Sequence, residues 1–151
     1  EWSTSALGEN QVGWDWFALH LSNDLDLMYY QIRQADDTAS PFTSGVLVDS
    51  AGAATPIQRS DVTLEVLDQW RSPTTGIEYP SGWRLQVPDR GIDLTIRPLI
   101  EDQELDVSVR YWEGAVEVEG SVGSEAVAGR GYVELTGYGN DSEAGESGMP
   151  F

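Results

Sequence analysis

The sequence contains no cysteine, no lysine and a single histidine, His20. Without cysteine there are no disulfides, thiolate metal sites or cysteine nucleophiles. One histidine also excludes a metal site built from several histidines, so we expect no metal and no cofactor. No apolar run approaches the roughly 20 residues of a membrane span, and no signal-peptide pattern is present. Because the chain begins at Glu1 rather than Met, we expect that an upstream segment has been removed.

Positive charge is scarce. Asp and Glu number 26 against 8 arginines, which gives a formal net charge of -18. Such a surface repels phosphate backbones and anionic membrane surfaces, so nucleic acid is an unfavourable partner. The plainest interpretation of the acidic composition is a solubility or salt-adaptation trait.

What is present is a series of short strands separated by turns. The length of 151 residues suits one domain, and no segment of convincing length has a helical period. Sequential hairpins predict an all-β fold, an antiparallel barrel of about eight to nine strands with an interior that side chains or one small ligand can fill. We expect the barrel over residues 1–138, an acidic Gly/Ser-rich tail over 139–151, and a bulge at Gly114. The expected strands are 13–21, 27–33, 45–48, 62–70, 83–87, 92–97, 107–112, 115–118 and 127–138.

Several familiar functional motifs are absent, or the residues that resemble them are better explained in another way. There is no G-x-S-x-G elbow. The glycines of Gly129-Arg130-Gly131 lack the context of a dinucleotide loop, and strand twist or a close backbone contact explains them better. The run from Asn23 to Asp26 is better explained as a hairpin turn than as a calcium loop.

The first expected strand is apolar on both faces, as in a strand covered on both sides. In a barrel one side is the interior, so a loop, a second domain or a partner subunit must cover the other. Ordinary core packing of the aromatics is the alternative. We expect Trp14, Trp16 and His20 to face a second domain or a symmetric partner. One face holds Trp14, Trp16, Ala18 and His20, and the other holds Asp15, Phe17, Leu19 and Leu21.

Two carboxyls are expected on the same strand face as apolar residues, because they alternate in step with them. They are Asp15, at the start of its strand, and Glu113, at the end of another. Desolvation raises the pKa of such a carboxyl, so that it can donate a proton near neutrality. The alternative is that each pairs with an arginine, and Arg33, Arg110 and Arg130 are the candidates. His20 is expected to be a hydrogen-bonded structural histidine rather than a catalytic one.

Several aromatic motifs in order resemble one family. GWDWFALHL, LMYYQIR, YPSGWRLQVP, RYWEGAV and GRGYVELTGY, with the opening EWSTS, look like the C-terminal lipocalin-like domain of the AttH and carotenoid 1,2-hydratase (hydroxyneurosporene synthase) superfamily. The resemblance runs from about Glu1 to Tyr138. It implies a lipocalin-like antiparallel barrel that is the second of two such domains.

The resemblance implies three activities. Carotenoid hydratases add water to an isolated isoprenoid double bond, and distant relatives include pericyclases that fold polyenes in a pocket between two barrels. AttH-like proteins are often secreted or lipid-anchored and encoded beside ABC-transporter permeases. A periplasmic or secreted location, or attachment to a membrane through a removed N-terminal segment, is therefore expected.

Two hypotheses follow. The first is a cofactor-independent hydratase, a carbon–oxygen lyase acting on an apolar isoprenoid-like substrate. Asp15 or Glu113 would protonate the alkene, and aromatic faces would stabilise the cation. The second is a non-enzymatic module that binds an apolar small molecule or a second domain. A carboxyl that lines a cavity without an arginine favours the enzyme, and one held in an ion pair on the barrel wall favours the module. The expected aromatic wall is Trp16, Tyr30, Tyr111 and Trp112.

Overall fold

The computed structural model describes residues 10–36, 38–106 and 110–139. This part contains ten β-strands in one sheet, all paired antiparallel, together with two short 3₁₀ turns and no α-helix. The all-β prediction is therefore confirmed. The strands are β1 (Gln11–Leu21), β2 (Asp26–Gln34), β3 (Ser44–Val48), β4 (Ala54–Gln58), β5 (Thr63–Arg71), β6 (Glu78–Val87), β7 (Ile92–Pro98), β8 (Glu104–Asp106), β9 (Arg110–Val122) and β10 (Glu125–Thr136), and the turns are η1 (Arg59–Asp61) and η2 (Pro88–Arg90).

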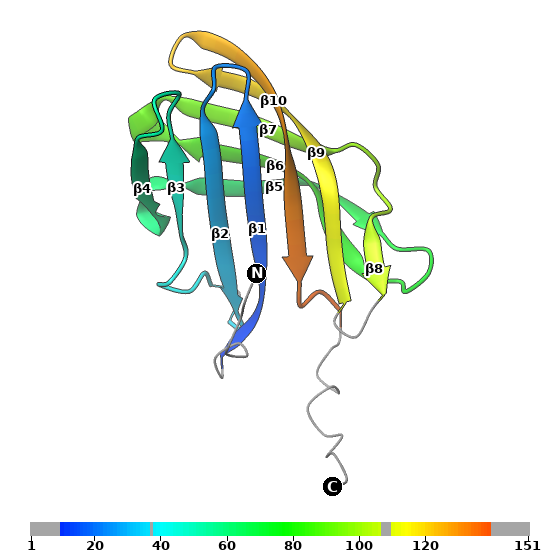
Figure 1. The fold of residues 1–151 in the computed structure, drawn as a ribbon. Helices are drawn as coiled ribbons and strands as arrows, with labels where there is room; N and C mark the ends of the chain where they lie inside the picture. Colours follow the sequence, from blue (N-terminus) through cyan, green and yellow to red (C-terminus); the bar gives the residue numbers. More distant parts are fainter. Residues whose placement is uncertain (1–9, 37, 107–109, 140–151) are drawn as a thin grey trace, which may run out of the picture.

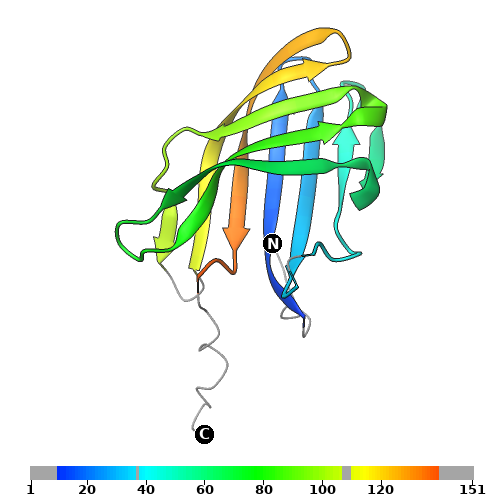
Figure 2. The ribbon, with the colours of Figure 1, turned by 180° about the vertical axis from the view of Figure 1, so that it is seen from behind.

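The sheet is curled into a half-barrel. Its strand order is β4-β3-β2-β1-β10-β9-β7-β6-β5, with β8 paired to β9 outside this path. Strands β1 to β4 and β10 form a front layer, and β5, β6 and β7 cross behind it (Figure 1). The view from behind shows the same crossing with β5 to β7 in front (Figure 2). Since β4 and β5 are the two ends of the strand order, the expected barrel is open along one seam.

The core lies between the two layers. In β1 the odd positions point into it: Phe17, Leu19 and Leu21 are at most 2% exposed. The indole of Trp83 packs edge-on against Phe17, with ring centroids 5.6 Å apart, and lies 6.1 Å from Trp112. Side chains thus fill the interior of the half-barrel.

Three expectations about the strands were wrong. Gly114 is not at a bulge, because β9 runs through it in unbroken register with β10. A Cβ at Gly114 would lie 2.3 Å from the side-chain amide of Gln103, so the glycine makes room for that side chain. β4, which contains Pro56, was not expected as a strand, and β6 begins at Glu78, before the expected strand 83–87.

Some expectations fall outside the described residues. They concern the opening segment 1–9, the tail beyond Gly139, and Val107 and Val109, whose parity was compared with that of Glu113. Within the described residues, no helix is long and apolar enough to cross a membrane.

Candidate functional site

The outward side of β1, β2, β3 and β10 is an apolar surface, which we call the outer aromatic face. The register pairs Trp16 with Tyr30 on β2 and with Glu134 on β10, so these side chains form one row across the sheet. The next row along the strands aligns Val46, Met28, Ala18 and Tyr132. Except for Tyr132, which is 43% exposed, these apolar side chains are half-buried. The outer aromatic face is defined by Trp14, Trp16, Ala18, Met28, Tyr30, Val46 and Tyr132.

Hydrogen bonds hold several of these rings in place. The indole N–H of Trp14 donates to Oε1 of Glu134 at 2.6 Å, and its ring meets Tyr111 edge-on with centroids 6.5 Å apart. The Ser44 hydroxyl donates to the Tyr30 oxygen at 2.9 Å. Rings held by several contacts lose little further freedom when a partner covers them.

One end of the outer aromatic face is polar. His20 is exposed, and its Nδ1 lies 2.6 Å from Oδ1 of Asp26. A shallow depression of about 370 Å³ lies beside this pair. Its lining is mostly apolar and includes Ala18, Met28, Val46 and Tyr132, with Arg130 at its border.

Asp15 points the other way, toward the inner side of the half-barrel, where its side chain is 5% exposed. Nε of Arg33 donates to its Oδ1 at 3.1 Å, and the Tyr138 hydroxyl donates to the same oxygen at 3.0 Å. Burial raises the pKa of Asp15, against the opposing effects of the Arg33 charge and of the two hydrogen bonds. Asp15 is thus a carboxyl held in an ion pair on the barrel wall.

Arg33 connects this carboxyl to the end of β10. Its Nη2 donates to the backbone oxygen of Thr136, and its guanidinium lies 3.9 Å above the Tyr138 ring. Tyr138 continues into a row of rings, 5.6 Å from Tyr79, which stacks on Trp70 at 6.2 Å. Burial, followed by the neighbouring Asp15 charge, raises the pKa of Tyr138.

A second group of polar side chains, which we call the Glu104 cluster, consists of the carboxylate of Glu104 in β8 and three hydroxyls around it. It was not expected from the sequence. The two carboxylate oxygens accept hydrogen bonds from Ser72 at 2.5 Å, Thr75 at 2.7 Å and Tyr79 at 2.8 Å. Burial alone raises the pKa of Glu104, but these hydrogen bonds and the charge of Arg110 outweigh it, so its pKa is lowered. The donors lie 25 to 32 residues away in sequence, so no local motif marks them.

The residues expected to form one catalytic pocket are not brought together. Trp112 is 1% exposed in the core, and its indole N–H donates to the backbone oxygen of Glu101 at 2.7 Å. The other three aromatics of the expected wall, Trp16, Tyr30 and Tyr111, take the outward positions of their strands. Glu113 is half-buried on the outer side, opposite Glu134. The sheet therefore separates Asp15 from Glu113 and from the three outward aromatics.

Gly129 and Gly131 of β10 lie opposite the inward-pointing residues Leu21 and Leu19 of β1. A Cβ at Gly129 would lie 2.3 Å from the backbone oxygen of His20, and one at Gly131 2.2 Å from that of Ala18. The expectation that these glycines mark close strand contacts is confirmed. Among the described residues, no group of three or more His, Cys, Asp or Glu side chains could hold a metal ion.

Comparisons with known proteins agree with this architecture. A structure described as an AttH from Nitrosomonas europaea is 37% identical to this chain, with a TM-score of 0.78 over 91% of the chain. The match covers 42% of the Nitrosomonas protein, so this chain spans less than half the length of that relative. No curated protein matches the sequence. The sequence model of the AttH-like family matches residues 1–138, and the chain therefore belongs to the AttH-like family.

Proposed function

We propose that this domain is a non-enzymatic lipocalin-like module of an AttH-type protein, whose outer aromatic face packs against a second lipocalin-like domain. The observation that carries the proposal is the row Tyr30–Trp16 on the outward side of a sheet whose inner side already holds a complete core. Contiguous aromatic surface of this kind is uncommon on a monomer and typical of interfaces. AttH-family membership and the greater length of the Nitrosomonas relative support a domain as the partner.

The face also suggests the chemistry of that partner. Glu113 and Glu134 lie opposite each other beside Trp16 and Trp14, which places two carboxylates within an aromatic surface. Like charges directly opposed across a sheet are unfavourable unless a cation compensates them. A partner that covers this pair would desolvate both carboxylates, so we expect its contacting face to carry no carboxylate at this point.

Self-association of the isolated chain tests the proposal, because a second copy can occupy the same face. Trp16→Ser removes a central ring, and Phe42→Ser, at an unrelated loop residue that is 70% exposed, is the matched control. Sedimentation equilibrium should show dimers that tighten as salt rises, because the net charge of -18 opposes pairing at low salt. Trp16→Ser should weaken the dimer and Phe42→Ser should not. A wild-type chain that stays monomeric at every salt concentration would contradict the proposal.

A carotenoid 1,2-hydratase-like activity is the second candidate, and the raised pKa of the buried Asp15 favours it. Tyr138, Tyr79 and Trp70 form an aromatic row behind that carboxyl, of the kind that stabilises a cation. The ion pair with Arg33 counts against it, because it favours the ionised carboxylate.

Substitution of Asp15 separates the two functions. Loss of a general acid lowers turnover by about 10²–10⁴-fold, so Asp15→Asn should abolish hydration of an isoprenoid alkene if the domain is a hydratase. Glu113→Gln, which changes a carboxyl on the other side of the sheet, is the control. The module predicts no hydration by the unmodified chain.

A further inference from the structure

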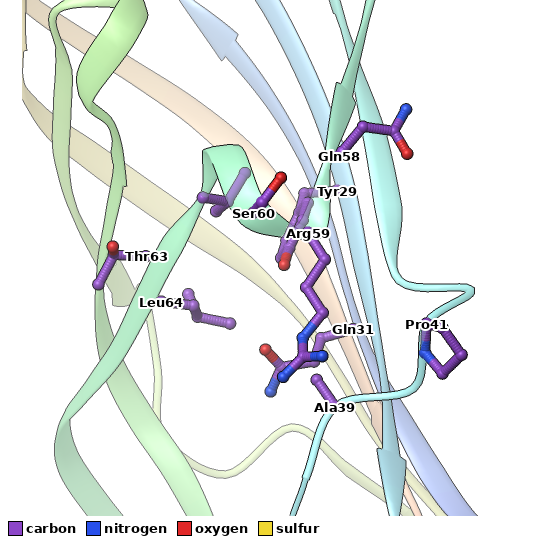
Figure 3. A pocket seen from close by; sticks show the side chains of 10 residues that line it. Tyr29, Gln31, Ala39, Pro41, Gln58, Arg59, Ser60, Thr63 and Leu64 are labelled. Atoms are coloured by element: carbon purple, nitrogen blue, oxygen red, sulfur yellow. The ribbon is translucent and has the colours of Figure 1, made fainter.

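The seam where the half-barrel stays open contains a cleft. It has a volume of about 670 Å³ and lies beneath the turn η1, between the start of β5 on one side and β2 with the loop residues Ala39 and Pro41 on the other (Figure 3). This volume is in the range of small-molecule sites. The described residues that line it are Tyr29, Gln31, Ala39, Pro41, Gln58, Arg59, Ser60, Val62, Thr63 and Leu64.

The charge of this lining differs from that of the whole protein. None of these ten described residues is acidic, whereas acidic residues outnumber basic ones 26 to 8 in the chain. The single charged residue is Arg59, whose side chain extends into the cleft and points toward Gln31 and Ala39 (Figure 3). Elsewhere in the described residues, Arg33, Arg71 and Arg84 each form an ion pair with a carboxylate.

Arg59 acts electrostatically on the floor of the cleft. Tyr29 is 1% exposed, and burial raises its pKa to about 12 although the Arg59 charge works to lower it. The cation therefore sits close enough to a desolvated phenol to bias its ionisation, and the same field favours any anion placed beside it.

The other walls mix polar and apolar side chains. Gln31, Gln58, Ser60 and Thr63 are polar, and Leu64, Val62, Pro41 and Ala39 are apolar. Leu64 and Val62 supply the β5 side, and Pro41 supplies the opposite side. The core behind them is closed, because Ile57 and Tyr29 are at most 2% exposed. A ligand in the cleft can lay a short apolar chain along these walls but cannot pass into the interior.

We propose that this cleft binds a monocarboxylate with a short apolar chain, with its carboxylate on Arg59 and its chain against Leu64 and Val62. A guanidinium matches a carboxylate in two parallel hydrogen bonds. A phosphate monoester fits less well, because its second charge would find no second cation among the described lining residues and would meet the strongly negative field of the protein. This site is separate from the outer aromatic face and does not depend on the proposed function.

Titration of the intact chain with octanoate, followed by NMR, tests the site. Octanamide is the neutral probe of the same length. Arg59→Gln removes the cation, and Arg90→Gln, at the basic residue of the other 3₁₀ turn, is the matched control. We expect saturable octanoate binding with shifts at Ala39 and Leu64, and binding at least about tenfold weaker in Arg59→Gln, as for loss of one charge-assisted hydrogen bond. Arg90→Gln should bind like wild type, and octanamide should bind weakly.

Several results would overturn the proposal. They are the absence of saturable octanoate binding, equal affinity in Arg59→Gln, octanamide binding as tightly as octanoate, or shifts centred on Trp16 and Tyr132 of the outer aromatic face. Tighter binding of octyl phosphate than of octanoate would likewise overturn the choice of a monocarboxylate. The dispersion of the amide spectrum of Arg59→Gln shows whether that variant remains folded, and if it does not, Tyr29→Phe provides a second variant of the same lining.

Discussion

At the scale of single residues, Asp15 shows what strand parity can and cannot predict. Alternation along 13–21 correctly placed it on the same side as Phe17 and Leu19, which are core residues. The sequence left three arginines as candidate partners, and the pairing with Arg33 depends on the β1–β2 register, which places Gly13 opposite that arginine. Tyr138, the second donor, comes from 123 residues further along the chain.

Removing the Asp15 carboxylate should leave the Arg33 guanidinium without its counter-charge in the wall of the half-barrel. We predict that Asp15→Ala lowers the free energy of unfolding by about 2–4 kcal/mol, less than a fully buried pair loses, because the Arg33 side chain is 20% exposed. Glu113→Ala, on the outer side of the sheet, should change it by no more than about 0.5 kcal/mol. Urea unfolding measures both. Equal effects of the two substitutions would show that the ion pair contributes nothing.

Glu104 predicts a specific dependence on pH. Its pKa is lower in the folded chain than the ordinary value of 4.5, so its stabilising contribution is present above pH 4.5 and is lost as pH falls through the folded-state pKa. Glu104→Gln should therefore be less stable than wild type at neutral pH, and the two unfolding free energies should converge in acid. Glu125→Gln, at the exposed start of β10, is the control for losing one negative charge. A difference that stays constant down to pH 3 would contradict this interpretation.

At the scale of elements, the pairing of β10 with β1 depends on glycines in β10. A Cβ at Gly131 would meet the Ala18 backbone oxygen, which cannot move without breaking the ladder. Gly131→Ala should therefore destabilise the chain by about 1–3 kcal/mol. Gly82→Ala in β6 is the control, because the nearest atom is 3.5 Å away, and alanine there should be neutral or stabilise by up to about 1 kcal/mol. Thermal unfolding measures both variants. A Gly131→Ala variant as stable as Gly82→Ala would show that the close approach is absent.

Strands with clear alternation were predictable from the sequence. The expected segments 13–21, 27–33 and 92–97 all lie within β1, β2 and β7. β4 was missed because it is only five residues long and contains Pro56, which an edge strand tolerates. Gly114 was misinterpreted because a glycine inside a strand marks either a bulge or a close neighbour, and only the position of Gln103 decides between them.

The candidate site was predictable only in part. Parity assigned Trp14 and Trp16 to one side of the strand, and their half-buried positions agree with it. Trp112 and Trp16 are both aromatic residues in expected strands, and the β9–β10 register, which pairs Trp112 with the buried Leu135, puts Trp112 in the core. The Glu104 cluster and the cleft at Arg59 arise where distant segments meet, so they have no local sequence signal.

At the scale of the whole molecule, the half-barrel has a filled interior, an open seam and one apolar outer surface. Among the described residues, core side chains such as Phe17 and Trp83 pack against each other between the two layers. The apolar surface instead lies outside, over β1, β2, β3 and β10, in a chain whose net charge of -18 otherwise favours solvation. The central claim is that a second lipocalin-like domain covers this surface.

Oxidative footprinting of aromatic side chains, in the protein as its own cells produce it, tests that claim most directly. Phe42, which is 70% exposed on a loop, is the internal reference for a ring open to solvent. If a partner domain covers the outer aromatic face, Trp16 and Tyr132 should be strongly protected relative to Phe42, and the protection should disappear in a dilute, low-salt solution of the isolated 151-residue chain. Tyr132 and Trp16 oxidised to the same extent in both preparations would contradict the account.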